Sequence, residues 1–297
     1  MSHSHHDHNH NASGEQNIKI AFFLNFVFTL LEIAGGIWTN SMAILSDALH
    51  DLGDSLSLGL AWYFEKKSAQ KPDSRFSFGY ARFSLLGAVI NSIVLVGGSV
   101  LVLAKTIPRI FAPEQVRAEG MLVFAVFGIA VNAADMLKVR KGQSYNQKVV
   151  SWHLLEDVLG WAVVLVAGIV LLFADIPIID PLLSVGITFY VLFNAVKNLI
   201  EVVRIFLQGT PDECSIEEIE KDIKQKFDII KIYHTHIWSL DGQKNLLTTH
   251  IVIADDTPPE KTAGIKKGIR DHLITKGIIH ATIEVEYESE KVDKHDF

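Results

Sequence analysis

Two pairs of histidine and aspartate with the same spacing are the residues best suited to chemistry. His50 and Asp54 lie four positions apart, as do His153 and Asp157, and each pair sits inside a long apolar stretch. Residues four apart on a helix share one face, about one turn from each other. Two such helices facing each other would offer two imidazoles and two carboxylates, a set that can hold a tetrahedral zinc-like ion. We therefore predict a divalent-metal site at these four residues.

The wider pattern around the first pair indicates that the site lies within a membrane. Asp47, His50, Asp51 and Asp54 form a single polar stripe along a helix. Ionisable side chains at membrane depth are costly, so they face a bundle interior or a water-filled path and mark transport routes. The repeated His-to-Asp spacing favours His50 and Asp54 as the ligands. If Asp47 and Asp51 were the ligands instead, the harder site would favour manganese or iron.

The elements that must position these residues are long apolar segments. The chain is 49% hydrophobic, and its apolar residues come in blocks separated by charged connectors. A helix needs about 20 residues to cross a hydrocarbon core. We therefore predict an α-helical membrane protein with six transmembrane helices. Their expected ranges are 18–38, 42–64, 83–107, 119–139, 150–173 and 182–206.

The charges of the connectors predict the orientation in the membrane. Basic residues gather after the second and fourth segments, at Lys66, Lys67, Lys71, Arg75, Arg82, Lys138, Arg140, Lys141 and Lys148. The connectors after the first and fifth segments carry none, and the connector after the third has Lys105, Arg109 and Arg117. Because basic connectors stay in the cytoplasm, we expect both termini there and the chain in the inner cell membrane. The net charge of −7 says little about nucleic acid, but no basic stripe suggests it, so we expect no nucleic-acid partner.

Composition divides the chain into three regions. Residues 1–17 hold five histidines in the first ten positions and little apolar surface, so we expect a disordered tail. This tail is either a collector of metal or a dispensable extension. Residues 18–208 form the expected transmembrane domain. Residues 209–297 have the composition of a soluble domain, and their lone Cys214 suits a reducing compartment.

The soluble region predicts the order helix–strand–strand–helix–strand. Ser215 and Glu218 form a capping-box signature before an amphipathic helix. Two β-rich runs at 230–240 and 244–254 follow, and a strand over 281–287 alternates polar with apolar residues. This order predicts a small two-layer α/β domain, similar to a ferredoxin-like fold lacking an element.

As a whole the chain resembles the cation diffusion facilitator family, in particular its zinc-transporting branch. The resemblance rests on the six segments, the His-rich N-terminus, the two HxxxD motifs and the soluble tail. Further matches are Ser77-Phe78-Gly79-Tyr80 before the third segment and Ile237-Trp238-Ser239-Leu240 in the tail. The resemblance implies a homodimer that exchanges a metal ion for protons, with its intramembrane ligands on the four residues of the HxxxD motifs.

The chain departs from the family pattern in two places. Some members carry another metal site after the second segment, built from an aspartate and two histidines. Here Asp73 is followed by Phe76 and Tyr80 at the histidine positions, so we predict no metal site in that connector. The His-rich loop between the fourth and fifth segments of many eukaryotic relatives is also missing, which favours a bacterial-type protein.

In the tail, the resemblance implies a regulatory metal site at His236, His250 and Glu286. The hairpin between the two histidines decides whether they can meet. A two-residue turn at Asp241-Gly242 would put them on opposite faces of the sheet, and a three-residue connection would put them on the same face. Ordinary half-buried strand histidines are the alternative.

These observations predict a transporter that exchanges Zn²⁺ for protons and exports the metal from the cytoplasm by alternating access. The alternatives keep the fold and change the ion to cadmium, cobalt, nickel, iron or manganese, or make the protein a membrane metal sensor. An intramembrane hydrolase would require a motif such as HExxH, which does not occur, although Glu156 beside His153 offers a base. We therefore do not expect an enzyme.

Other acids in the apolar segments have two readings that the sequence leaves open. Glu32, Asp47, Asp51 and Asp135 either relay protons or form hydrogen bonds between helices. Asp180, followed by Pro181, is typical of an N-cap before a proline at the first helical position, and we assign it no chemistry.

Overall fold

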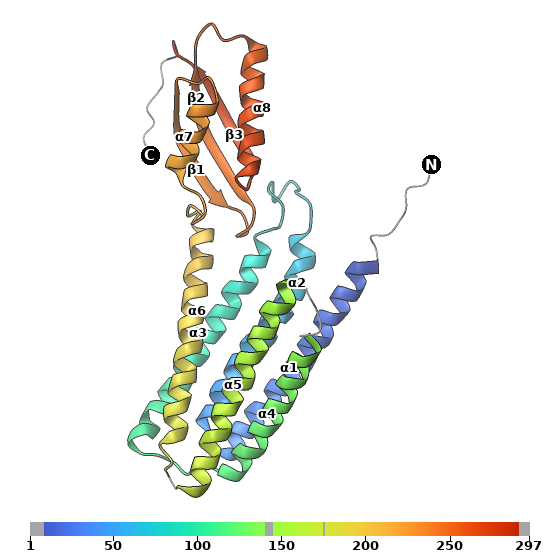
Figure 1. Cartoon of the computed structure of the whole chain (residues 1–297), viewed down its shortest axis with the longest axis vertical. Coiled ribbons are helices and arrows are strands. Elements are labelled where there is room, and N and C mark those ends of the chain that lie inside the picture. The colour runs from blue at the N-terminus through green and yellow to red at the C-terminus, as the bar shows by residue number, and fades with distance from the viewer. Residues whose placement is uncertain (1–8, 140–144, 175, 291–297) are drawn as a thin grey trace. The chain divides into compact units, whose positions relative to one another are not determined.

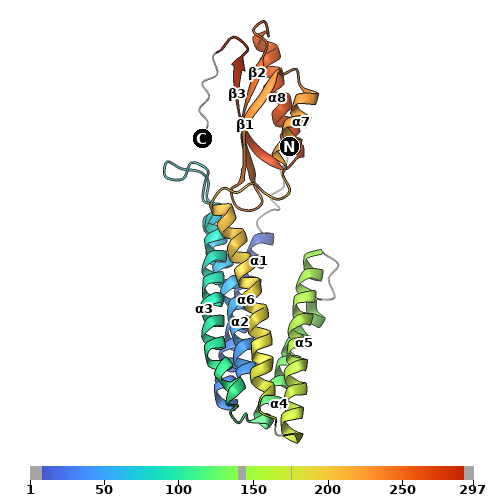
Figure 2. The same cartoon turned by 90° about the vertical axis from the view of Figure 1, so that its left-hand side faces the viewer.

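The computed structural model describes residues 9–139, 145–174 and 176–290 and divides into two compact units. The helical unit contains the residues up to 66 and residues 87–199, and the second unit contains residues 67–86 and 200–297. Figures 1 and 2 show both units from two sides.

Long helices that run side by side build the helical unit (Figures 1 and 2). They are α1 (Asn9–Thr39), α2 (Met42–Ser68), α3 (Phe83–Phe111), α4 (Ala118–Val139), α5 (Tyr145–Phe173) and α6 (Ile179–Phe206). Residues 1–8 of the His-rich tail lie outside the described residues. Residues 9–17, which were expected in the disordered tail, form the first turns of α1.

Within the part of the chain that the structure describes, four of these helices are long and apolar enough to cross a membrane. The qualifying stretches are Phe22–Thr39, Phe83–Phe111, Leu155–Phe173 and Ile179–Phe206. In α4 the apolar stretch is shorter, at Ala118–Ala134. Although α2 has 27 residues, it carries Asp47, Asp51 and Asp54, and these acids lower its hydropathy. The structure thus gives a membrane-type helical unit with four candidate spans, while the expected count of six remains a prediction.

Aromatic and small residues form the core between α1, α4 and α5. Trp161 of α5 is 1% exposed, and its ring packs edge-on against Phe28 of α1, with centroids 6.3 Å apart. Gly128 of α4 permits this packing, because a Cβ at that position would lie 2.3 Å from the indole ring. This contact fixes α5 against the helices that precede it.

A carboxylate from α6 caps α2. Asp180 is 1% exposed and accepts hydrogen bonds from the backbone N–H groups of Met42, at 2.7 Å, and Ala43, at 3.2 Å. The Ser41 hydroxyl also donates to it and accepts from Ile44 N. Orphan N–H groups at a helix start attract negative charge. Asp180 therefore lies inside the first turn of α6 and caps a different helix, whereas the sequence suggested a cap of its own helix.

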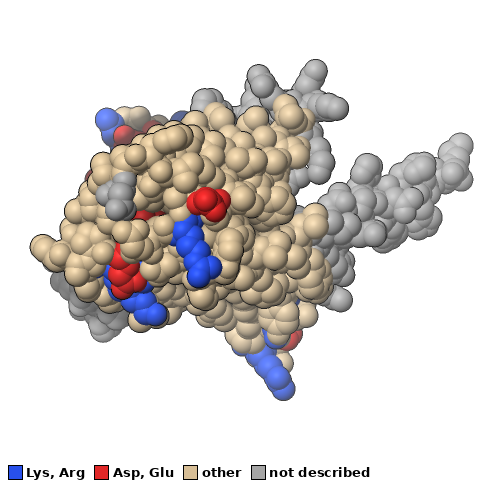
Figure 3. Space-filling view, turned by 90° about the horizontal axis from the view of Figure 1, so that it is seen from below, with Lys and Arg blue, Asp and Glu red and all other residues tan. Residues whose placement is uncertain are grey.

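Hydroxyl groups join α2 to α3 and α6 near this capped end. The Ser46 hydroxyl lies 2.6 Å from the hydroxyl of Ser184 on α6, and Thr188 donates to Ser46 at 3.0 Å. Thr106 of α3 lies 3.2 Å from Ser184. Figure 3 looks along the helices at this end, where charged side chains are few and scattered among uncharged ones.

The second unit contains a mixed sheet with two helices. Its elements are α7 (Ile216–Lys226), β1 (Lys231–Ser239), β2 (Asn245–Ile253), α8 (Pro259–Thr275) and β3 (Ile278–Tyr287), in the predicted order. Strand β2 is central, antiparallel to β1 and parallel to β3. Isoleucine and leucine side chains of α7 and α8 pack on the sheet in one buried cluster. The Ser215 hydroxyl accepts from Glu218 N at 3.2 Å and so caps α7 as the capping box predicts.

The other face of the sheet is polar. In β3, the residues that alternate with the buried Ile283 include Thr282 and Glu284, and Glu284 pairs with His250 of β2. The candidate tail ligands gather on this polar face.

The connector between α2 and α3 belongs to the same compact unit, where Arg82 Nε donates to the carbonyl of Leu240 at 3.2 Å.

Candidate functional site

The acidic stripe of α2 lies in the interior of the helical unit. Asp47 and Asp51 are buried, while His50 and Asp54 are half-buried. All four belong to two consecutive turns of one helix and share one face, so they present a single polar stripe to the helices packed against α2. Such a stripe cannot face lipid at low cost.

His50 lies between two carboxylates from different helices. Its Nε2 is 3.9 Å from Asp54 Oδ2 on α2 and 3.7 Å from Asp157 Oδ1 on α5. A tetrahedral ion with bonds of about 2.0–2.1 Å holds its ligand atoms roughly 3.3 Å apart. The observed separations are slightly wider than that spacing. A small movement of the side chains toward a common centre would therefore let all three hold one ion.

The structure thus brings together three of the four residues of the HxxxD motifs. His153 lies on α5, one helical turn before Asp157, and its side chain lies outside the described residues. The spacing on a continuous helix places it on the same face as Asp157. Asp157 has an 11% exposed side chain, so the site is only partly open to water.

The other acids of α2 have different neighbours. Asp51 lies against α1, where Asn25 Nδ2 donates to its carbonyl at 3.3 Å. Asp47 lies close to α5, because a Cβ on Gly160 would be 3.9 Å from its Oδ1. The described geometry places His50 within 4 Å of Asp157.

In the tail, three candidate ligands converge on the polar face of the sheet. His250, Glu284 and Glu286 each place one ligand atom within 4.8 Å of the others. His250 Nδ1 lies 2.8 Å from Glu286 Oε1, and its Nε2 lies 3.6 Å from Glu284 Oε2. The Tyr233 hydroxyl donates to Glu286 at 2.6 Å. One imidazole and two carboxylates form a ligand set that suits a divalent metal ion.

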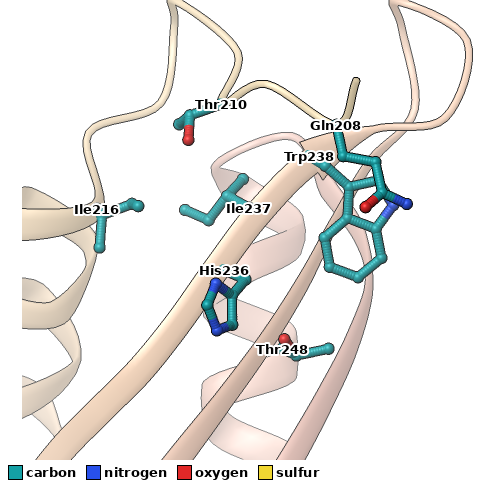
Figure 4. Close-up of a pocket in the computed structure, with 7 residues that line it drawn as sticks. All are labelled: Gln208, Thr210, Ile216, His236, Ile237, Trp238 and Thr248. Carbon is teal, nitrogen blue, oxygen red and sulfur yellow. The ribbon is translucent and has the colours of Figure 1, made fainter. Parts of the chain in front are cut away.

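His236 lies apart from this cluster. It pairs with Thr248, two residues before His250, so both histidines are on the same face of the sheet. A connection of five residues, 240–244, and a bulge between Tyr233 and His236 produce this register. His236 lines a cavity of about 370 Å³, and Figure 4 shows it there beside Thr248. Sequence reasoning missed Glu284, although it lies two residues before Glu286 on β3 and therefore on the same face, which was a signal for it.

Charge and hydrogen bonds keep Glu286 ionised. Burial opposes ionisation of its carboxyl, but hydrogen bonds with Tyr233 and His250 outweigh that effect and hold the pKa of Glu286 below its usual range. Burial and the bond to Glu286 raise the pKa of Tyr233 to about 12. The stability that Glu286 contributes is therefore present above its usual pKa of about 4.3 and is lost as the pH falls toward its folded pKa.

The aspartate of the connector after α2 forms hydrogen bonds within that connector. Asp73 accepts hydrogen bonds from the Tyr80 hydroxyl at 2.7 Å and from Phe76 N and Arg75 N at 2.8 Å each. The bond from Tyr80, followed by those from the two backbone groups, lowers the pKa of Asp73. Its carboxylate shapes a tight turn, as aspartates in loops often do.

Comparison with known proteins identifies the family. Residues 18–207 match the cation efflux transmembrane domain. The chain belongs to the cation diffusion facilitator family. This facilitator is an integral membrane protein that acts on divalent metal ions.

Bacterial relatives match this facilitator over nearly its whole length. A protein named zinc transporter ZitB, from Pectobacterium atrosepticum, is 31% identical over 95% of this chain and 89% of the relative. A protein named cadmium, cobalt and zinc/H(+)-K(+) antiporter, from Bacillus velezensis, is 32% identical over 94% of this chain and 91% of the relative. The metal cation efflux system protein CzcD of Cupriavidus metallidurans is 31% identical over 95% of this chain and 89% of the relative.

Proposed function

We propose that this facilitator exports Zn²⁺ from the cytoplasm in exchange for protons, through a site formed by His50, Asp54, His153 and Asp157. The observation that carries the proposal is the position of His50 within 4 Å of carboxylates from α2 and α5. Both helices that carry an HxxxD motif, α2 and α5, thereby contribute side chains to the same candidate site. The names of relatives that match over nearly the whole chain support zinc, and one of those names includes proton exchange.

Metal binding at such a site displaces protons. Ligation needs neutral imidazoles and ionised carboxylates, so arriving zinc expels protons that these groups hold. Histidine titrates near neutral pH and suits that exchange. In the inward-facing state the cytoplasm supplies zinc and receives protons. In the outward-facing state external protons displace the metal, and alternating access about the fixed site completes the cycle.

The ligand types favour zinc over manganese. Two imidazoles and two carboxylates suit zinc, whereas all-oxygen sites suit manganese. Cadmium and cobalt, which also occur in the names of relatives, are the nearest competitors for the same ligands.

We further propose the architecture in which the site works. Six helices cross the inner cell membrane over residues 18–208, and both termini lie in the cytoplasm, as the charges of the connectors indicate. Two copies form a homodimer in which the tails, residues 209–297, pair. Residues 1–17 collect metal at the cytoplasmic entrance. We propose a transporter and not an enzyme, since none of these features requires an enzymatic reaction.

The experiment that tests the function is ion flux in proteoliposomes under an imposed pH gradient. Wild-type protein should accumulate zinc against its concentration gradient when the gradient delivers protons, and should move manganese at least about tenfold more slowly, because imidazole ligands disfavour manganese. Dissipating the pH gradient should abolish the accumulation. Zinc movement that ignores the pH gradient would contradict proton exchange, and tight zinc binding without any flux would indicate a sensor.

For the tail, we propose a regulatory zinc site at His250, Glu284 and Glu286 that Tyr233 supports. Glu286→Gln should weaken zinc binding at the tail by about 10-fold to 100-fold, since it removes a charged ligand and the acceptor of two hydrogen bonds. The measurement is calorimetric titration of the full-length protein carrying Asp157→Ala, which silences the transmembrane site.

His236→Ala is the matched control for the tail site. It removes a histidine of the same sheet face that lies outside the cluster, so the tail affinity should stay within about threefold of the parent. A large loss in His236→Ala with little change in Glu286→Gln would move the site to the ligand set that the sequence alone implies.

A further inference from the structure

A seam of polar residues joins α1 to α2 beside the proposed metal site. Asn25, Thr29 and Glu32 are spaced four and three residues apart, so they share one face of α1. Asn25 Nδ2 donates to the carbonyl of Asp51 at 3.3 Å, and the Thr29 hydroxyl lies 3.4 Å from that of Ser55. The first two residues of the stripe thus have partners on α2.

Glu32, the third residue of the stripe, faces acids on α2. Its side chain is 1% exposed, and the described residues offer its carboxylate oxygens no hydrogen-bond donor, because the group within hydrogen-bond reach is the carboxyl of Asp51. Its strongest charged neighbours are Asp51 and Asp47 of α2, followed by Asp157 of α5. All of these neighbours are acidic.

The environment of Glu32 disfavours a bare negative charge. An isolated carboxylate in an apolar interior costs several kcal/mol, and like charges nearby add to that cost. A cation must therefore compensate it. A proton needs only one oxygen atom and no rearrangement of the seam, whereas a metal ion requires several ligands at fixed distances.

We propose that Glu32 binds one of the protons that this transporter exchanges for metal, on a group separate from the metal ligands. Asp157 links the two places. Its Oδ1 lies 3.7 Å from His50 Nε2, and its negative charge also disfavours a negative charge on Glu32. When a divalent ion binds between α2 and α5, its positive charge offsets the carboxylates that surround Glu32. The Glu32 carboxyl then releases its proton to cytoplasmic water and becomes a carboxylate.

The reverse step occurs on the outer side. After the metal leaves, Glu32 again faces acidic neighbours without a compensating cation and takes one proton from external water. One proton thus moves inward for each metal ion that moves outward, in addition to any proton that the metal ligands exchange. This inference rests on the proposed function, because it supplies a proton carrier for the same site.

The test compares Glu32→Gln with wild type in full-length protein. Glutamine keeps the shape of the side chain but cannot release a proton. Titration of zinc in buffers with different ionisation enthalpies counts the protons released. We expect zinc affinity within about threefold of wild type, about one fewer proton released per zinc, and pH-driven accumulation lower by about tenfold or more.

Thr29→Ala is the matched control, because it alters the same seam without removing a proton carrier, and it should keep the wild-type proton count. Unchanged proton release in Glu32→Gln would overturn the proposal. A loss of zinc binding in that variant would also overturn it, since Glu32 would then serve the metal. If Glu32→Gln does not fold, Glu32→Met decides, because methionine has a similar size and cannot hold a proton: about one fewer proton released per zinc supports the proposal, and a wild-type count rejects it.

The design separates this inference from the proposed function. If wild-type protein shows no pH-driven accumulation, proton exchange as the transport mechanism fails. The proton count on zinc binding would still report whether Glu32 releases a proton.

Discussion

Replacing either His50 or Asp157 by alanine should abolish zinc accumulation in proteoliposomes. The two side chains lie 3.7 Å apart and come from the two HxxxD helices, so each change removes a ligand that the other residues cannot replace. Loss of even a supporting residue around a metal costs about 10-fold to 100-fold in affinity, and loss of a direct ligand should exceed that. We expect transport below about 1% of the wild-type rate, with normal insertion and oligomeric state.

Glu156→Gln provides the control for this result. Glu156 precedes Asp157 on α5 and is exposed, so its neutralisation changes the local charge without touching the site. Its zinc flux should stay close to wild type. Retention of proton-driven zinc uptake by His50→Ala or Asp157→Ala would contradict the assignment of the site.

Replacing Asp180 by alanine should strongly destabilise the helical unit. The change leaves the Met42 and Ala43 N–H groups and the Ser41 hydroxyl without their buried acceptor. Each orphaned donor costs about 1–3 kcal/mol, and the negative charge at the start of α2 is also lost. We expect thermal unfolding in detergent to begin about 6–12 °C lower, with Asp180→Asn in between.

Asp212→Ala is the comparison for this change. Asp212 forms an ion pair with Arg204, but its side chain is 82% exposed, and exposed pairs contribute little to stability. Its unfolding temperature should stay within about 2 °C of wild type. Equal shifts in the two variants would show that the Asp180 cap does not stabilise α2. Since α2 carries His50 and Asp54, Asp180→Ala should also weaken zinc binding.

Local spacing explains why so much of the site could be predicted. The HxxxD pattern fixes which side chains share a helix face, and two ionisable faces in one membrane protein have few stable positions other than facing each other. The juxtaposition of His50 and Asp157 therefore follows from the sequence with little knowledge of the tertiary structure. The alternation along β3 likewise fixes which face carries Glu286.

The remaining features depend on long-range packing that no local pattern reveals. Asp180 caps a helix that begins 138 positions earlier in the chain, so its own neighbours suggest the wrong helix. The register of His236 depends on a bulge in β1. Glu32 could be recognised as an intramembrane acid, but its lack of a donor becomes visible only once α1 packs against α2.

The proposed transport mechanism depends most directly on the ligands that hold zinc between α2 and α5. X-ray absorption of zinc bound to the Glu286→Gln variant, with the tail site weakened, would identify them. We expect four nitrogen and oxygen neighbours at about 2.0–2.2 Å, with scattering from two imidazoles that falls to one in a variant that also carries His50→Asp. A shell of oxygen atoms alone, unchanged by that substitution, would contradict the account.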